Sequence, residues 1–315
     1  MNDFADSSAT IMQRGADDPA LAQLRVDFSP STGAALSFVF AGSAAHSVRV
    51  HCKRLAGPTA PEAWHVGDAY RALVLEQVES DGDISTAARR IYADLIARAR
   101  GSSHPYLLRI WNYLGDINAG DGDNERYRHF CVGRATAVDA QFNDPPPAAT
   151  AIGHDGDRAD LQLIALCGRE PGIALENPRQ TPAWNYPRAY GPVPPGFSRG
   201  AVLGASSASP RLLASGTASI VGHVSQHVGD VAEQVRESLR NLEALLGVGN
   251  DRSGQRFAMA TCEALRVYLR HADDLSIAQS VVAASQLPID RVLYLHGDVC
   301  RRELDVELEG VFAPA

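Results

Sequence analysis

The sequence predicts an α+β fold of two similar units, each a mixed sheet covered on one face by helices. Short runs of aromatic and β-branched residues alternate with longer stretches whose apolar residues recur every three or four positions. The same order of strands, an amphipathic helix and a strand with an aromatic centre occurs in both halves. The two aromatic-centred strands are residues 109–114 and 265–269. This repetition indicates a duplicated unit.

The composition is that of an ordinary globular protein. Of 315 residues, 45% are hydrophobic and 21% are charged, which excludes a largely disordered chain and allows two domains. The formal net charge of -8 argues against nucleic acid and anionic membranes as partners. Lys53 is the only lysine. A site for an anion must therefore be built from arginines, whose guanidinium can hold a carboxylate with two hydrogen bonds.

Cysteine usage and the chain start favour the cytoplasm. The five cysteines lie far apart with no CxxC pair, which argues against a disulfide framework and a zinc site. The first twenty residues include Asp3, Asp6, Asp17 and Asp18 but no basic start followed by an apolar run. We expect neither secretion nor a membrane span, since no apolar stretch approaches about 18 residues.

The first half predicts several strands and one helix. The helix begins near a capping Ser85, and Ile91, Leu95 and Ala99 form its apolar stripe. A turn region follows the last strand of this half, from 115 to 124. The predicted strands are 36–40, 48–52, 72–75 and 107–114.

The prolines at 145–147 predict a domain boundary. Three successive prolines cannot continue a helix, and they stiffen the chain as a spacer. We therefore expect an N-terminal domain over 1–143 and a C-terminal domain over 144–315.

The second half repeats the plan. Its longest helix runs from Val231 to Leu246 and ends at Gly247, and a shorter one begins near Asp273 or Asp274. Strict alternation over 304–309 predicts a closing strand with Leu304, Val306 and Leu308 on one face. The segment 215–219 is predicted to be a glycine-bearing turn. The other predicted strands are 161–167, 201–203, 256–269 and 292–295.

The segment from Asn177 to Arg199 is the richest in chemistry. Arginines alternate with aromatic residues on a stretch with six prolines between 176 and 199. Guanidinium groups beside aromatic rings suit an anionic ring compound. The alternative is a surface loop that packs its aromatics for stability alone.

Glu307 and Cys300 are further candidates, each with two interpretations. Glu307 lies on the polar face of the last strand, where a glutamate is usually solvated. In a pocket, desolvation would raise its pKa and make it a general acid, whereas a nearby arginine would lower that pKa. Cys300 precedes Arg301 and Arg302, which would lower a thiol pKa, yet lone cysteines are most often small buried hydrophobes.

His223 and His227 are four residues apart, as two metal ligands on a helix would be, but no third ligand has a familiar spacing. We interpret them as turn histidines. The sequence also lacks GxGxxG, P-loop and GxSxG patterns, so nucleotide cofactors and serine-hydrolase chemistry have no support.

Several motifs resemble known families. SGTAS at 215–219, the helix with Gln234, Ser238 and Asn241, and VELEGV at 306–311 resemble the RidA/YjgF superfamily. A further set occurs in the same order as in the chorismatase family. These motifs are LRIWNYL (108–114), YRHFCVGR (127–134), ENPRQ (176–180), YPRAYG (186–191), FSR (197–199) and LHGDVCRR (295–302).

The resemblance implies two YjgF-like domains and an enzyme that removes the enolpyruvyl group of chorismate without metal or organic cofactor. It implies that Glu307 is the catalytic acid and that Cys300 selects the product, since members with cysteine there form 3-hydroxybenzoate and members with alanine form a dihydroxycyclohexadiene acid. 4-Hydroxybenzoate is a further product to test. YjgF relatives form trimers, so a homo-oligomer is expected unless the two domains satisfy those interfaces internally. The residues expected to shape the substrate pocket are Arg134, Tyr186, Arg188, Tyr190 and Arg199.

Two alternative functions remain at this stage. The shared superfamily fold also fits an imine deaminase like RidA, although single-domain RidA chains would lack the segment from Asn177 to Arg199. The same pocket could also bind aromatic carboxylates without turnover.

Overall fold

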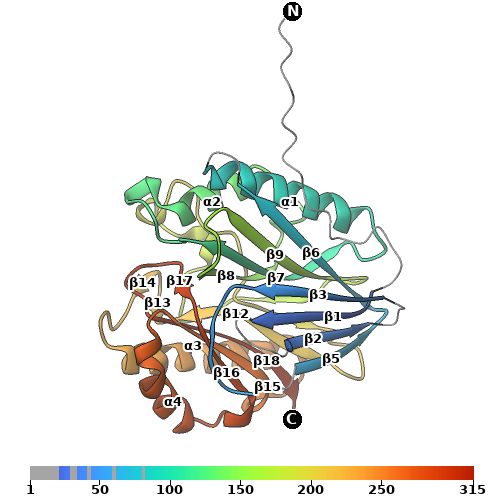
Figure 1. The fold of residues 1–315 in the computed structure, drawn as a ribbon. Coiled ribbons are helices and arrows are strands. Elements are labelled where there is room, and N and C mark those ends of the chain that lie inside the picture. Colours follow the sequence, from blue (N-terminus) through green and yellow to red (C-terminus); the bar gives the residue numbers. More distant parts are fainter. Residues whose placement is uncertain (1–20, 29–33, 41–43, 59–61, 80–81) are drawn as a thin grey trace, which may run out of the picture.

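The computed structural model describes residues 21–28, 34–40, 44–58, 62–79 and 82–315 (Figure 1). The acidic N-terminal residues, on which the expectation of no targeting segment rests, lie outside this described part.

The first unit is a mixed sheet with two helices packed on one face. Its central strands β7 and β8 are parallel, and β9 and β6 continue the sheet in antiparallel pairs, in the order β8-β7-β9-β6. The elements in chain order are β6 (Tyr70–Val78), α1 (Ile84–Arg100), β7 (Tyr106–Gly115), α2 (Arg126–Ala135), β8 (Ala148–His154) and β9 (Asp160–Gly168).

The second unit has the same topology. Its strands follow the order β16-β15-β18-β12, again with one parallel pair, β15 with β16, and two antiparallel pairs. The predicted α+β fold and its duplicated plan are thus confirmed. The elements are β12 (Arg211–Ala218), α3 (Val231–Ser253), β15 (Phe257–Leu269), α4 (Leu275–Ala283), β16 (Val292–His296) and β18 (Val306–Pro314).

The two sheets exchange edge strands. β4 (Arg54–Ala56) pairs with β16 of the second unit, and β17 (Asp298–Val299) pairs with β8 of the first. At its other edge the second sheet is extended by β11 (Gly200–Leu203) and β10 (Ile173–Leu175), and β13 (Ile220–Val221) forms a hairpin with β14 (Val224–Ser225).

A third sheet precedes both units. The sequence predicted only two of its strands, and its order is β3-β1-β2-β5. The strands are β1 (Leu21–Phe28), β2 (Ala34–Phe40), β3 (Ala44–Val50) and β5 (Glu62–Gly67).

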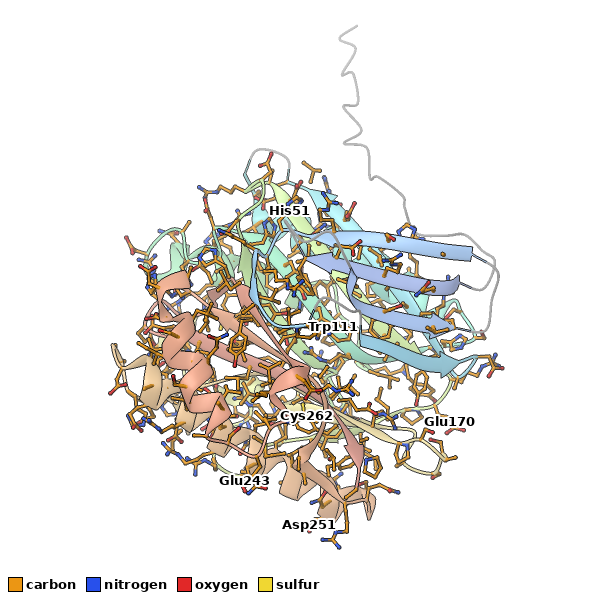
Figure 2. All side chains as sticks on the ribbon, turned by 60° about the horizontal axis from the view of Figure 1, so that its bottom comes forward. His51, Trp111, Glu170, Glu243, Asp251 and Cys262 are labelled. Carbon is orange, nitrogen blue, oxygen red and sulfur yellow. The ribbon has the colours of Figure 1, made fainter. Side chains whose placement is uncertain are left out.

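One hydrophobic core joins the inner faces of all three sheets. Phe38 comes from the N-terminal sheet, Trp111 and Tyr113 from the first unit, and Tyr268 and Leu295 from the second. Figure 2 labels Trp111 near the middle of the molecule, where the sheets face one another. The helices cover the outer faces, and α1 contributes the predicted stripe of Ile91, Leu95 and Ala99 to a separate core. None of the helices in the described part is long and apolar enough to span a membrane.

Three element predictions were wrong in detail. Asp83, not Ser85, caps α1, because its carboxylate accepts from the backbone amides of Ser85 and Thr86. α3 continues through Gly247 to Ser253, and Gly254 with φ 70° ends it, since a left-handed residue stops a helix. Residues 215–218 belong to β12, with an irregular register between Ala214 and Thr217 that resembles a bulge.

The places of β8 and β9 in the first sheet, on either side of β7, test where the domain boundary lies. Both strands follow the prolines at 145–147, yet they complete the sheet that begins with β6. The prolines end the connection from α2 to β8 inside the unit. We therefore propose that the first unit ends after Gly168, in place of the division at 143 and 144.

Candidate active site

A cavity of about 190 Å³ lies at the start of β18. Its walls come from the first turn of α2 in the first unit and from two segments of the second half, one before β11 and one after β17. The site therefore depends on both units. Its charged lining residues are Glu125, Arg128, Arg199, Arg301, Arg302, Glu303 and Glu307.

Glu307 is the first inward-facing residue of β18. Val306 and Leu308 point to the other face, where they join the core beneath α3. Glu307 itself is only 5% exposed although it lines the cavity. Burial raises the pKa of its carboxyl to about 8, with Glu309 adding to the rise, while Arg109 and Arg199 oppose it. At neutral pH this carboxyl holds a proton.

Because Gly216 has no side chain, it leaves the space that the Glu307 carboxyl occupies. A Cβ on Gly216 would lie 1.9 Å from Oε1 of Glu307, a distance at which one of the two must move. The irregularity in β12 brings this glycine opposite the carboxyl, and its amide donates to the Thr150 hydroxyl at 2.9 Å. The SGTAS motif, which contains Gly216, therefore forms the floor of the cavity next to the Glu307 carboxyl.

Arg199 is anchored but retains a free donor. Its Nη2 donates to the Thr181 carbonyl at 2.9 Å and to the Tyr186 hydroxyl at 2.7 Å. Its Nε is buried and has no hydrogen-bond partner among the described residues. The Arg199 amide donates to the carboxyl of Glu176 at 3.2 Å, and burial raises the pKa of Glu176 to about 7.

Arg301 also lines the cavity. Its guanidinium carbon lies 4.1 Å from the centre of the Tyr190 ring and 5.1 Å from that of Tyr186. Its Nη1 donates to the His223 carbonyl at 2.9 Å, whereas its Nη2 is buried without a partner in the described part of the chain. Arg199 and Arg301 thus both line the cavity, and each has one buried nitrogen without a partner among the described residues.

Cys300 lines the same cavity as a neutral thiol. Burial raises the pKa of its thiol, and the neighbouring Glu307 raises it further, while Arg301 only partly opposes this. A protonated thiol is a poor nucleophile, so its chemistry here is that of a small, polarisable wall residue.

Comparison with known proteins decides the family. Residues 52–167 match the family described as "Chorismatase FkbO/Hyg5-like, N-terminal". A protein named "Chorismatase" from Streptomyces rapamycinicus is 39% identical over 244 residues, which is 75% of this chain and 73% of that protein. The chain belongs to the chorismatase family. It is therefore an enzyme of this type, as the sequence motifs predicted.

Two further chorismatase relatives agree. A protein named "3-hydroxybenzoate synthase" from Streptomyces hygroscopicus is 36% identical over 245 residues, covering 75% of this chain and 72% of that protein. A crystal structure of a chorismatase at 1.08 Å resolution matches with a TM-score of 0.75 and 31% identity, over 97% of this chain and 96% of the other. The likeness thus extends over the whole fold.

The structure brings five of the seven expected site residues together in this cavity, namely Tyr186, Tyr190, Arg199, Cys300 and Glu307. The other two lie elsewhere. Arg134 is buried and does not line the cavity, and its guanidinium lies 5.9 Å from the Tyr92 ring and 5.8 Å from the Phe130 ring. Arg188 points outward, and both of its terminal nitrogens donate to the carboxylate of Asp123.

Arg301 was missed by sequence reasoning, which treated it only as a neighbour that could lower the pKa of Cys300. Its role depends on the direction of its side chain, which a motif of two adjacent arginines does not reveal. The pair of tyrosines around it was the only usable signal, because aromatic rings in a cationic site often contact a guanidinium.

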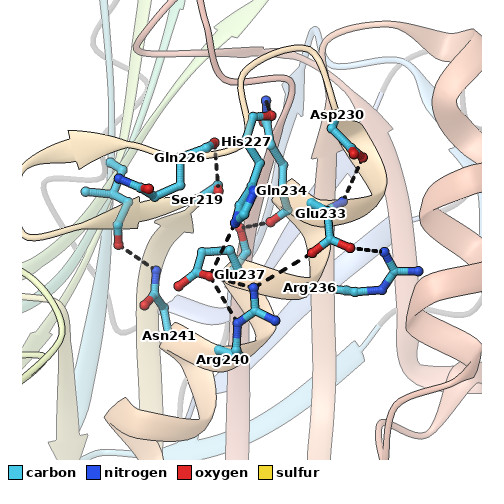
Figure 3. Close-up of polar contacts among 12 residues, drawn as sticks. Ser219, Gln226, His227, Asp230, Glu233, Gln234, Arg236, Glu237, Arg240 and Asn241 are labelled. Atoms are coloured by element: carbon cyan, nitrogen blue, oxygen red, sulfur yellow. Dashed lines mark hydrogen bonds and ion pairs between the residues drawn. The ribbon is translucent and has the colours of Figure 1, made fainter.

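α3 holds the wall segments in place. Arg179 donates to the side chains of Asn241 and Glu237, and Asn177 donates to the Asn241 carbonyl at 2.7 Å. Figure 3 shows the neighbouring part of this network, in which Arg240 also pairs with Glu237 at 2.6 Å. The outer face of the same helix is charged, with Glu243 and Asp251 at the surface (Figure 2).

His223 and His227, which the sequence analysis considered as metal ligands, have different surroundings. His227 faces Glu237 with Nε2 3.6 Å from its carboxylate (Figure 3), whereas the His223 ring packs edge-on against Tyr190. Across the described residues, no three His, Cys, Asp or Glu side chains are grouped as metal ligands.

Proposed function

We propose that this chain converts chorismate into pyruvate and 3-hydroxybenzoate, with Glu307 as the general acid. The observation that carries the proposal is a carboxyl group buried in an arginine-lined cavity, with a pKa of about 8. A general acid works best when its pKa lies near the working pH, because it is then protonated and still able to transfer the proton.

The arrangement of arginines supports a dicarboxylate substrate. Chorismate carries one carboxylate on its ring and one on its enolpyruvyl group, and burying either without a partner would be strongly unfavourable. Arg199 and Arg301 both line the cavity, and we assign one guanidinium group to each carboxylate. Tyr186 and Tyr190 then bound the space for the ring.

The chemistry balances without a cofactor. Glu307 gives its proton to the methylene carbon of the enol ether, which leaves a cation stabilised by the ether oxygen. The bond between the ring and that oxygen breaks as the adjacent ring hydroxyl displaces it, so pyruvate leaves and the hydroxyl proton restores the acid. Opening of the resulting epoxide, with loss of a ring proton, gives the aromatic acid. Pyruvate and hydroxybenzoate together contain all the atoms of chorismate, so neither water nor an oxidant is consumed.

A chorismate assay with Glu307→Gln tests the acid. The wild-type protein should release pyruvate and 3-hydroxybenzoate, with a rate that falls as pH rises through about 8, because the acid must be protonated. Glu307→Gln keeps the shape but lacks the proton, and it should lower kcat at least about 100-fold. Chromatography separates 3- and 4-hydroxybenzoate. Wild-type turnover by the variant would exclude this acid, and ammonia release from an imine would favour the deaminase alternative.

A further inference from the structure

A buried cluster of charges lies directly behind Glu307. Glu309 lies two residues further along β18 and faces the same side, with 1% of its surface exposed. One of its oxygens accepts from Arg109 at 2.5 Å and from the Thr150 hydroxyl at 2.6 Å. The other accepts from Arg266 at 3.0 Å and from the Tyr268 hydroxyl at 2.8 Å.

The cluster joins the acid to both units. Arg109 belongs to β7 of the first unit, whereas Arg266 and Glu309 belong to the second. The Thr150 hydroxyl that bonds Glu309 also accepts from the amide of Gly216, the residue beneath Glu307. The cluster therefore contacts the floor of the site, although it does not line the cavity itself.

The cluster holds two arginines and one carboxyl group, that of Glu309. Burial alone would raise the pKa of Glu309, but Arg109 and Arg266 outweigh it and hold that pKa below its ordinary value. Two cations and one anion then leave one net positive charge. The other charged or titratable groups that act on Glu307, or feel it, are Arg199 from the segment before β11, Tyr127 from α2 and Cys300 after β17.

We propose that Glu309 is a positioning residue for this reaction: its negative charge offsets the arginines behind the active site, so that Glu307 keeps the proton it must donate. Without Glu309, the positive charge of Arg109 would act on Glu307 with no opposing charge from this carboxylate. An opposite charge at close range favours the ionised form of a carboxyl. Glu307 would then lose its proton at a lower pH. This inference rests on the proposed role of Glu307 as the acid.

Carboxyl titration in Glu309→Gln tests the proposal. In protein labelled with ¹³C at the glutamate carboxyl carbons, the resonance absent from Glu307→Gln reports the proton on Glu307. In Glu309→Gln its midpoint should fall by about one pH unit or more. Pyruvate release near neutral pH should fall with it and recover at lower pH. A folded variant with an unchanged midpoint would overturn the proposal.

Three variants separate charge from packing. Arg109→Met should move the Glu307 midpoint upward, and Arg109→Lys, which keeps the charge, should return it towards wild type. Tyr268→Phe removes a hydrogen bond to Glu309 without changing any charge, so an equal shift in this variant would refute the electrostatic explanation. If Glu309→Gln does not fold, the Arg109 pair decides the question by the same measurement.

The two proposals can fail independently. If wild-type protein releases no pyruvate but the midpoint of Glu307 still moves as described, the proposed function fails and the electrostatic coupling stands. If pyruvate release requires Glu307 but its midpoint ignores both Glu309 and Arg109, the coupling fails and the function stands.

Discussion

Arg199 and Arg188 belong to one segment but have opposite surroundings. Arg199 is 4% exposed and bonded to Tyr186, whereas the Arg188 side chain is 65% exposed and pairs with Asp123 at the surface. Only Arg199 lines the cavity. The same truncation of the two residues therefore separates substrate binding from surface pairing.

Arg199→Ala should weaken chorismate binding by about 2 kcal/mol or more, or about 30-fold, because it leaves a buried carboxylate without its partner. Arg188→Ala should change the dissociation constant by less than about threefold, since exposed ion pairs contribute about 0–1 kcal/mol. Calorimetric titration on the Glu307→Gln background measures both. Equal effects of the two variants would remove Arg199 from the binding site.

Cys300→Ala should shift the products away from 3-hydroxybenzoate towards the dihydroxycyclohexadiene acid. The thiol stays protonated in its buried setting, so we expect it to act by filling space beside the ring and excluding water. Cys131→Ala is the control, because Cys131 is a buried thiol on α2 that does not line the cavity. Chromatography of the ring products reads out both, and an identical product ratio in Cys300→Ala would refute the steering role.

Single residues were predictable from sequence where a motif fixed them. Glu307 and Cys300 were chosen as candidates because each lies in a short sequence motif, one in the last strand and one in the loop before it. The direction of Arg188 was not predictable, because it depends on Asp123 from the other unit, 65 residues away in the chain. The pairing of Arg109 with Glu309 was also beyond sequence reasoning, since 200 positions separate them.

The irregular part of β12 provides a test at the level of one strand. Gly216→Ala should lower kcat at least about tenfold while the fold persists, because the added methyl group must displace the Glu307 carboxyl. Gly247→Ala is the control, since a Cβ there meets nothing within 4 Å. It should leave activity unchanged and stabilise α3 by about 0.5–1 kcal/mol. Steady-state kinetics and thermal unfolding measure both, and a fully active Gly216→Ala would contradict the packing argument.

The helices α1 and α3 and the strands β7, β9 and β15 were predictable because their signals are local, whereas α2 and β8 were not predicted. The spacing of Ile91, Leu95 and Ala99 identified α1, and alternation located β18, although Leu304 lies before this strand and packs in a separate cluster. The exchanged strands were not predictable, because β4 and β17 have only three and two residues and owe their structure to pairing with distant strands. The irregular part of β12 was predicted as a turn because glycine and serine occur in turns as well as in strand irregularities.

The duplicated units are equivalent in topology but not in chemistry. Gln162 is the first inward-facing buried residue of β9, as Glu307 is of β18, and each lies opposite a buried tyrosine. Those tyrosines, Tyr113 and Tyr268, approach each other with hydroxyl oxygens 3.2 Å apart. An amide cannot serve as a carboxylic acid, so we expect one acid per chain. Trimer formation stays a prediction, although the three sheets already cover one another's inner faces.

The shared core and the exchanged strands predict that the described sheets unfold together. Calorimetry should show one transition whose van't Hoff and calorimetric enthalpies agree, because neither unit can lose its sheet without exposing the core of the other. Leu295→Ala, in the core between the sheets, should destabilise the protein by about 2–5 kcal/mol and move the whole transition. Two resolved transitions, only one of which moves in Leu295→Ala, would show that the units fold independently.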